Sequence, residues 1–425
     1  RLQTPPAIVR STKAIFCLLA TCLLFLTACG TEPTAPLMGP DLEPITQFAK
    51  GGHPDLAPQC PAQPDWVVTT QEEFFQVIRW NAQPGDVVAI EGLIVTNRGA
   101  WTYTEGLTIT CASPGSGLVA DPGAEWAPGN LGYLFRIYAP NVTVTGLVLD
   151  AAAAPDGFIY ASNSGLSRLA ADLTFTNNAA NCGPESCLFF AGVKGSVVTD
   201  NHFRANGAGT GIHIQASGEI YPDGTREFPA DGTRVLRNTV IMTEPRPGNG
   251  DGWWMIMGGI RVRGGEDVTV AHNRVEGPWI NTLSFANLRG SVIANNSGWG
   301  AQLHGINFHD VPNDLWSLDN VVRNNQIADM EEYGAMVHNA CRTTFLGNNF
   351  RNPGLGAVAA FAETTGANAF VGNGKTVIDD GNWDCDGDGF VDPNLITGTR
   401  RIGSGVKLGP MVGGAAKGGK GAEIR

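Results

Sequence analysis

Short runs of alternating apolar and polar residues recur along most of this chain. In Asp267-Val-Thr-Val270 and Gly259-Ile-Arg-Val262 every second side chain is apolar. Gly and Asn separate such runs, rather than any stretch with a 3.6-residue period. A period of two is typical of half-buried β-strands, so the pattern predicts a protein built almost entirely of short strands.

A short phrase also returns between about residues 198 and 373: a hydrophobe, two variable residues, Asn, one more residue and usually another hydrophobe. Its Asn residues follow one another at steps of 23 to 37 residues: Asn201, Asn238, Asn273, Asn296, Asn325, Asn348 and Asn373. A repeat of a few tens of residues indicates stacked coils with one shared core. We expect each Asn to adopt left-handed backbone at a corner and to bond the same Asn one coil away.

Less regular copies of the phrase lie earlier, at residues 141–149 and 172–178. The repeats resemble the right-handed parallel β-helix of the pectin-lyase-like superfamily over roughly residues 80–380. The resemblance implies one elongated all-β domain, which we place at residues 58–380. The period of two predicts that one set of side chains points into its core: Ile212, Ile214, Ile260, Val262, Ile306 and Phe308.

Residues 70–81 differ from the rest because their apolar residues have helical spacing. Thr70 and Glu73 form a capping-box pattern at the start of this segment. We expect an amphipathic helix that closes the N-terminal end of the first coil, with that coil beginning at Gly85. Such a cap would cover an open strand edge.

Composition agrees with a solenoid of strands and turns: 56 Gly, 43% hydrophobic residues and only 16% charged residues. The formal net charge of −12 argues against nucleic acid as a partner. An anionic polysaccharide stays open as a partner, because a local basic groove can override the global sign of the charge.

The N-terminus has the pattern of an export signal. Arg10 and Lys13 precede an uncharged run over residues 14–28, which is short for a membrane span. Leu26-Thr-Ala-Cys29 resembles a bacterial lipobox, which implies cleavage after residue 28 and lipidation of Cys29. Gly30 in place of Asp then favours the outer membrane of the cell envelope. An ordinary signal peptide is the alternative; residues 29–57 are expected to form a flexible tether.

Six cysteines remain beyond Cys29, and an even number in an exported protein suggests three disulfides. Chain order favours the pairs Cys60 with Cys111, Cys182 with Cys187, and Cys341 with Cys385. A zinc site is the rival interpretation, but the spacing of the cysteines does not support it.

Residues 381–396 contain an acidic loop with Gly389 at its sixth position. The spacing of its oxygen donors matches a calcium-binding loop that would supply Asp384, Asp386, Asp388, the Phe390 carbonyl and Asp392. The twelfth position is Leu395 rather than Glu, so the segment resembles the shorter loops of thrombospondin-type or dockerin modules. We expect a structural Ca²⁺, with a solvated acidic turn as the alternative. Residues 397–425 form a basic, Gly-rich tail that we expect to be disordered.

Four runs that re-enter a strand after Gly offer candidate chemistry on their outward positions. If coils stack in register, one column contains His213, Arg261, Asn307 and Met336, and the next contains Gln215, Arg263, His309 and His338. Two long insertions flank these columns and carry Tyr221, Arg226, Trp253 and Trp254. Their rings could stack on sugars, or the Trp pair could only pack the loop onto the solenoid.

Arginine and histidine on an open face suit an acidic polysaccharide. In β-elimination at a uronate, cations neutralise the carboxylate and a base removes the C5 proton. Arg261 and Arg263 would be the cations, and His213 or His309 the base. Residues 258–264, Gly-Gly-Ile-Arg-Val-Arg-Gly, resemble a strand motif of the alginate-lyase and chondroitinase-B family. That family has a basic Lys and Arg pair in the preceding coil, where this chain has His213.

These patterns predict a cell-envelope lipoprotein, monomeric, that cleaves a uronate-containing polysaccharide as a lyase. A non-catalytic glycan-binding or structural lipoprotein is the alternative. A glycoside hydrolase ranks third, because the outward columns supply almost none of the paired carboxylates that hydrolysis needs.

Overall fold

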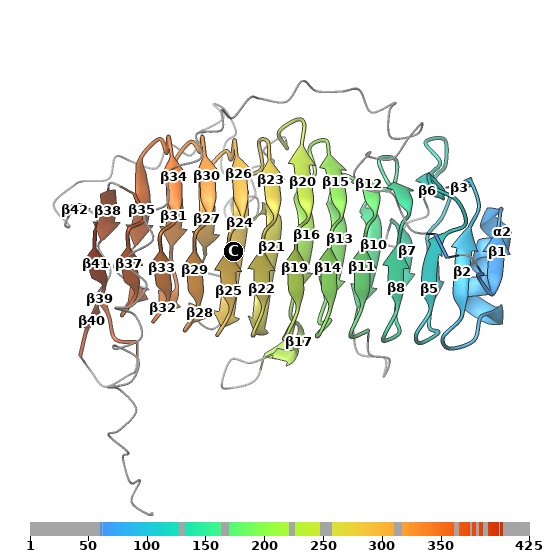
Figure 1. The fold of residues 1–425 in the computed structure, drawn as a ribbon, viewed down its shortest axis with the longest axis horizontal. Helices are drawn as coiled ribbons and strands as arrows, with labels where there is room; N and C mark the ends of the chain where they lie inside the picture. Colours follow the sequence, from blue (N-terminus) through green and yellow to red (C-terminus); the bar gives the residue numbers. More distant parts are fainter. Residues whose placement is uncertain are drawn as a thin grey trace, which may run out of the picture. The chain divides into compact units, whose positions relative to one another are not determined.

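Three long parallel β-sheets run along the molecule, and most coils of the chain add one strand to each sheet (Figure 1). The computed structural model describes residues 60–61, 63–126, 132–162, 170–220, 226–246, 257–309, 317–360, 365–374, 376–379, 382–385, 390–398 and 400–402. The architecture is a parallel β-helix, which confirms the all-β solenoid expected from the repeat. No helix in this part of the chain is long and apolar enough to cross a membrane.

Sheet A contains, in spatial order, β1 (Trp66–Val68), β2 (Val87–Ile90), β5 (Thr108–Cys111), β8 (Thr143–Thr145), β11 (Thr174–Thr176), β14 (Val197–Thr199), β19 (Arg234–Leu236), β22 (Thr269–Ala271), β25 (Val292–Ala294), β29 (Val321–Arg323), β33 (Thr344–Leu346), β37 (Ala369–Val371) and β41 (Leu395–Thr397). Sheet B contains β3 (Leu93–Thr96), β6 (Gly117–Ala120), β9 (Val148–Asp150), β12 (Ala179–Asn181), β15 (His202–Ala205), β20 (Thr239–Met242), β23 (Arg274–Glu276), β26 (Ser297–Trp299), β30 (Gln326–Ala328) and β34 (Asn349–Arg351).

Sheet C contains β4 (Ala100–Thr102), β7 (Tyr133–Ile137), β10 (Gly157–Ser162), β13 (Ser186–Ala191), β16 (Thr210–Gln215), β21 (Gly258–Glu266), β24 (Asn281–Arg289), β27 (His304–Phe308), β31 (Tyr333–Val337), β35 (Gly356–Ala360), β38 (Thr376–Asp379) and β42 (Arg400–Ile402). Three short strands pair beside this path: β28 (Ser317–Leu318), β32 (Ala340–Cys341) and β36 (Thr365–Gly366). Two hairpins are antiparallel: β17 (Ser217–Ile220) with β18 (Arg226–Phe228), and β39 (Asn382–Trp383) with β40 (Asp392–Pro393).

Helix α2 (Gln71–Gln76) lies in the segment where the sequence predicts one, and a π-helical turn, η3 (Val77–Asn81), continues it. Thr70 accepts from the Glu73 amide, and the Glu73 carboxylate accepts from the Thr70 amide, so both halves of the capping box form. The stacking itself begins earlier than Gly85, because β1 precedes the helix and pairs in parallel with β2. The first strand was missed because it is only three residues long.

A buried row of Asn side chains follows the corner between sheets A and B. Each amide Nδ2 donates to the Oδ1 of the next Asn along the solenoid, over N···O distances of 2.7–3.0 Å, as predicted for Asn201, Asn238, Asn273, Asn296, Asn325, Asn348 and Asn373. Asn178 joins the N-terminal end of this row. The predicted left-handed backbone was assigned to the wrong residue. The positive φ belongs to the residue before each Asn, such as Asp200 (56°) or His272 (59°).

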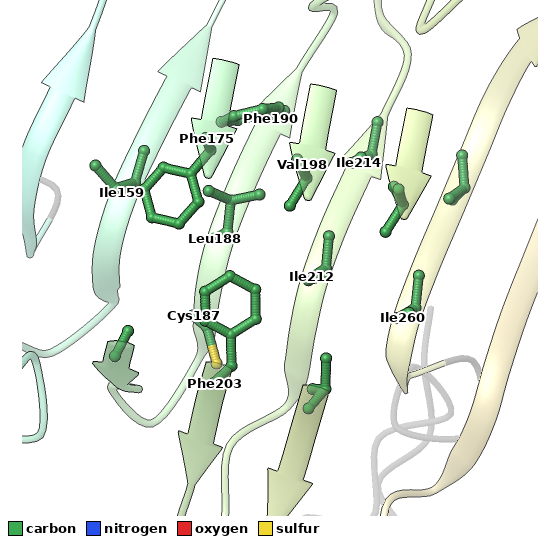
Figure 2. Packing of buried hydrophobic residues seen from close by; sticks show 14 of the residues in the cluster. Ile159, Phe175, Cys187, Leu188, Phe190, Val198, Phe203, Ile212, Ile214 and Ile260 are labelled. Atoms are coloured by element: carbon green, nitrogen blue, oxygen red, sulfur yellow. The ribbon is translucent and has the colours of Figure 1, made fainter. Parts of the chain in front are cut away.

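The predicted inward residues of sheet C are all fully buried: Ile212, Ile214, Ile260, Val262, Ile306 and Phe308. Figure 2 shows how Ile212, Ile214 and Ile260 line up with side chains from the opposite strands. Phenylalanines pack in the same core, and Phe158 and Phe175 stack with centroids 5.6 Å apart. One apolar cluster therefore continues from coil to coil, as the repeat requires.

The three predicted disulfides are confirmed: Cys60–Cys111, Cys182–Cys187 and Cys341–Cys385. The last one ties sheet C to the segment that carries the acidic loop. Within that loop the Asp392 carboxylate accepts from the Cys385 amide at 2.9 Å. Asp386 and Asp388 lie outside the described residues, as do Cys29, the export signal, the tether over residues 29–57 and most of the basic tail, so those predictions and the calcium site stay predictions.

Asn273 offers the sharpest test of the buried row. Asn273→Ala would remove hydrogen bonds from buried groups of Asn238, Asn296 and Val235, and we expect a loss of more than about 3 kcal/mol in the free energy of unfolding. Asn349→Ala is the matched control, because Asn349 is exposed, and it should cost less than about 0.5 kcal/mol. Equilibrium urea unfolding followed by circular dichroism measures both. Equal losses would show that the row does not hold the register.

Candidate functional site

The outward side of sheet C brings His213 and Arg261 to equivalent positions on neighbouring coils. Strand β16 pairs with β21 so that His213 faces Arg261 and Gln215 faces Arg263. Neighbouring strands in a sheet lie about 4.8 Å apart, so the imidazole, the amide and two guanidinium groups share one small area. These four side chains form what we call the β16–β21 cluster.

The predicted columns omit one coil. Strand β24 lies between β21 and β27, and it places Ser284 between Arg261 and Asn307 and Ala286 beside Arg263. Met336 follows Asn307 on β31, as predicted. The sequence did not reveal β24 because its run, Asn281-Thr-Leu-Ser-Phe-Ala-Asn-Leu-Arg289, does not start after Gly.

His309 and His338 continue the second column beyond Ala286. The His309 amide donates to the Phe285 carbonyl, and the His338 amide donates to the Phe308 carbonyl. Both residues therefore continue the sheet C hydrogen-bond ladder just after their strands end. His309 is therefore three coils from His213, or about 14 Å along the axis. The two histidines cannot serve the same bond of a substrate.

Most of these side chains are less accessible than the sequence suggests. The pattern predicts outward display, but Arg261 is only 6% exposed, Asn307 5% and His309 6%. His213 is half-buried, and its Nε2 is shielded from solvent and has no hydrogen-bond partner within the described part of the chain. The charge of a buried side chain such as Arg261 is therefore screened less by water than it would be on an open surface.

The pKa of His213 lies well below its usual value. Burial is the larger cause, because it disfavours the charged imidazolium, and the positive charges of Arg261 and then Arg263 act in the same direction. The imidazole is therefore neutral near pH 7, and a neutral imidazole can accept a proton.

Phe189 fixes the orientation of this imidazole. It precedes His213 in the same column, and the two rings stack with centroids 4.6 Å apart and an interplanar angle of 20°. Trp101, Arg136 and Tyr160 continue the column toward the N-terminus. The sequence analysis missed Phe189, although the period of two in Ser186–Ala191 points it outward between Leu188 and Phe190.

A second polar group lies further along sheet C. His304 is nearly buried, its Nε2 lies 3.7 Å from Oε2 of Glu332, and its ring stacks on Tyr333. Burial, and then the charge of His338, lower the pKa of His304 to about 3. The His304 imidazole is therefore neutral at pH 7, and its contact with Glu332 is not an ion pair. Burial raises the pKa of Glu332 in turn.

Some predicted binding residues lie outside what the structure describes: Tyr221, Trp253, Trp254 and the side chain of Arg226, whose backbone begins β18. Among the described residues, no group of three or more His, Cys, Asp or Glu side chains is arranged to hold a metal ion.

Comparison with known proteins supports the fold. Residues 230–375 match the sequence model of a family described as "Right handed beta helix region". No curated protein matches the chain.

Among solved structures, an alginate lyase from Paenibacillus sp. str. FPU-7 is 16% identical, covering 69% of this chain and 97% of its own, with a TM-score of 0.44. DFA-IIIase from Arthrobacter chlorophenolicus A6 in complex with GF2 is 13% identical over 81% and 92% of the two chains, with a TM-score of 0.46. The PL6 family alginate lyase AlyGC is 13% identical over 80% and 49%, with a TM-score of 0.47.

The titration of His213 tests the electrostatics of the cluster. We expect its imidazole to stay neutral well below the usual midpoint of about 6.5 when followed by NMR of histidine-labelled protein. Arg261→Gln should raise the midpoint only part of the way, because burial remains. Arg323→Gln, a change of an exposed arginine on sheet A, should leave it unchanged.

The same shift has a consequence for stability. The unfolded chain binds a proton at His213 as the pH falls through about 6.5, whereas the folded chain does not, so the free energy of unfolding should decrease below that pH. A wild-type midpoint at the ordinary histidine value, unmoved by Arg261→Gln, would contradict this description of the cluster.

Proposed function

We propose that this protein is a polysaccharide lyase that cleaves a uronate-containing chain by β-elimination at the β16–β21 cluster. The observation that carries the proposal is the pairing of a neutral histidine with two arginines on adjacent coils. Elimination requires a base beside an acidic carbon and a cation at the carboxylate that stabilises the developing negative charge.

Arg261 and Arg263 would bind the uronate carboxylate. A guanidinium offers paired N–H donors that match the two oxygens of a carboxylate. The low exposure of Arg261 makes its charge more effective than it would be in water. Neutralised in this way, the carboxylate withdraws electrons from C5 and makes the C5 proton easier to remove.

His213 would act as the base. Its neutral imidazole takes the C5 proton, the C4–C5 double bond forms, and the bond from C4 to the leaving oxygen breaks. Burial, and then the charges of the two neighbouring guanidinium groups, make the resulting imidazolium more acidic than an ordinary one. It can therefore return the proton to the leaving oxygen, so one side chain serves as base and then as acid. Phe189 would hold the ring in place during both steps.

The test is the ultraviolet absorbance of unsaturated uronates during incubation with acidic polysaccharides. We expect wild-type protein to produce the signal, and His213→Gln and Arg261→Ala to lower its rate about a hundredfold or more. Activity should persist below the usual histidine midpoint, because His213 stays neutral there.

Two matched controls lie away from the cluster. His272→Asn changes an exposed histidine at a positive φ that Asn tolerates, and Arg323→Ala changes an exposed arginine. Both should keep full activity. Absence of product on every uronate polymer, combined with retained glycan binding, would replace the lyase with the non-catalytic glycan-binding alternative.

We also propose that the protein acts at the cell envelope, anchored through a lipid on Cys29. The support is the lipobox-like sequence that ends at Cys29. Cys29→Ser should abolish incorporation of radiolabelled palmitate and release the protein from membranes, while the conservative change Thr31→Ser should do neither. Membrane retention of Cys29→Ser would count against the anchor.

A further inference from the structure

A cavity of about 380 Å³ lies where three neighbouring strands of sheet C end, beside the β17–β18 hairpin. Its walls come from β21, from β24 and from the hairpin with the residues that follow it. Figure 1 shows β17 projecting from the edge of the solenoid at this level. The volume falls in the range of small-molecule sites, roughly 300–1,000 Å³.

The cavity adjoins the β16–β21 cluster. Ala216 and Gly264 line it, and they directly follow Gln215 and Arg263 in the chain. Gly264 has a φ of 73°, and a Cβ there would come within 2.6 Å of the Ala216 Cβ. Only glycine fits that position, so the backbone that lines the cavity has a fixed conformation directly after Arg263.

Its lining is acidic overall, with three carboxylates against one guanidinium: Glu227, Asp231 and Glu266 against Arg289. Asp231 accepts from the Glu266 amide at 2.8 Å, and Glu266 lies 3.6 Å from Arg289. These contacts hold the lining side chains in place. They leave the excess of negative charge uncompensated.

Asn287 is the second observation that points to a ligand. Its side chain lines the cavity and is only 7% exposed, and it makes no hydrogen bond within the described part of the chain. Its amide atoms remain accessible, and a ligand with hydroxyl groups would satisfy both the donor and the acceptor.

We propose that this cavity binds a neutral or amine-bearing sugar ring attached to the uronate held at Arg261 and Arg263. Its carboxylates would accept hydrogen bonds from hydroxyl or amine groups, and Asn287 and Arg289 would donate. A second uronate would meet like charge there. The substrate class is therefore a heteropolymer that joins uronate to an uncharged or amino sugar, rather than a pure polyuronate; this inference rests on the proposed function.

The experiment compares two sets of oligosaccharides of equal length, one alternating hexuronate with N-acetylhexosamine and one built of hexuronate alone. Isothermal titration calorimetry in the His213→Gln background measures affinity without turnover. We expect the alternating chain to bind at least about tenfold more tightly. Glu227→Lys should lower that ratio at least about fivefold, since it replaces repulsion of a uronate with attraction.

Glu91→Lys is the matched control. Glu91 is exposed between β2 and β3 and does not line the cavity, so its change should leave the ratio unaltered. Thermal unfolding checks that all variants are folded.

The outcomes separate the two proposals. Equal binding of both sets, unaltered by Glu227→Lys, would overturn the cavity proposal and leave β-elimination standing. Preferential binding of the alternating chain, lost in Glu227→Lys, would support the cavity even if wild-type protein releases no unsaturated product, and that lack of product would overturn the lyase alone. Failure to bind either set would overturn both.

Discussion

The buried row of Asn side chains sets the register on which the rest of this molecule depends. Each amide donates to the Asn of the next coil and to a backbone carbonyl. Sliding one coil by a single residue would therefore leave several buried polar groups without hydrogen-bond partners. A one-residue slip would also turn the hydrophobic side chains outward. Because all three sheets share the same coils, register held at one corner aligns side chains on the outward face of sheet C.

That alignment gives the β16–β21 cluster its chemistry. His213 and Arg261 are 48 positions apart in sequence, with the β17–β18 hairpin between them, yet they are ladder neighbours. Packing two guanidinium groups beside a shielded imidazole disfavours any further positive charge. The same positive charges would attract the uronate carboxylate that we propose as the ligand. The cavity next to Gly264 is lined by three carboxylates and one guanidinium, and it would favour an uncharged or amine-bearing group instead.

Much of the fold could be predicted from the sequence, because its signals are local and repeated. The period of two identified the inward residues, the Asn repeat identified the stacking, and chain order identified the disulfides. The errors come from features without a local signature. Left-handed backbone falls one residue before the Asn, at Asp200 or His272, because the buried amide is needed after the corner rather than in it. Strand β24 starts without Gly, so its coil was not counted.

The candidate site could be predicted only in outline. The order of side chains along the columns follows from register, but their burial depends on neighbours that no short pattern encodes, as the 6% exposure of Arg261 shows. The stacking of Phe189 on His213 and the cavity beside Gly264 both arise between coils that are distant in sequence.

The most direct test is a crystal structure of the His213→Gln variant with a bound uronate-containing oligosaccharide. The account predicts that one carboxylate lies against the guanidinium groups of Arg261 and Arg263, with its C5 carbon facing residue 213. A carbohydrate bound on sheet A or sheet B, with sheet C empty, would contradict it.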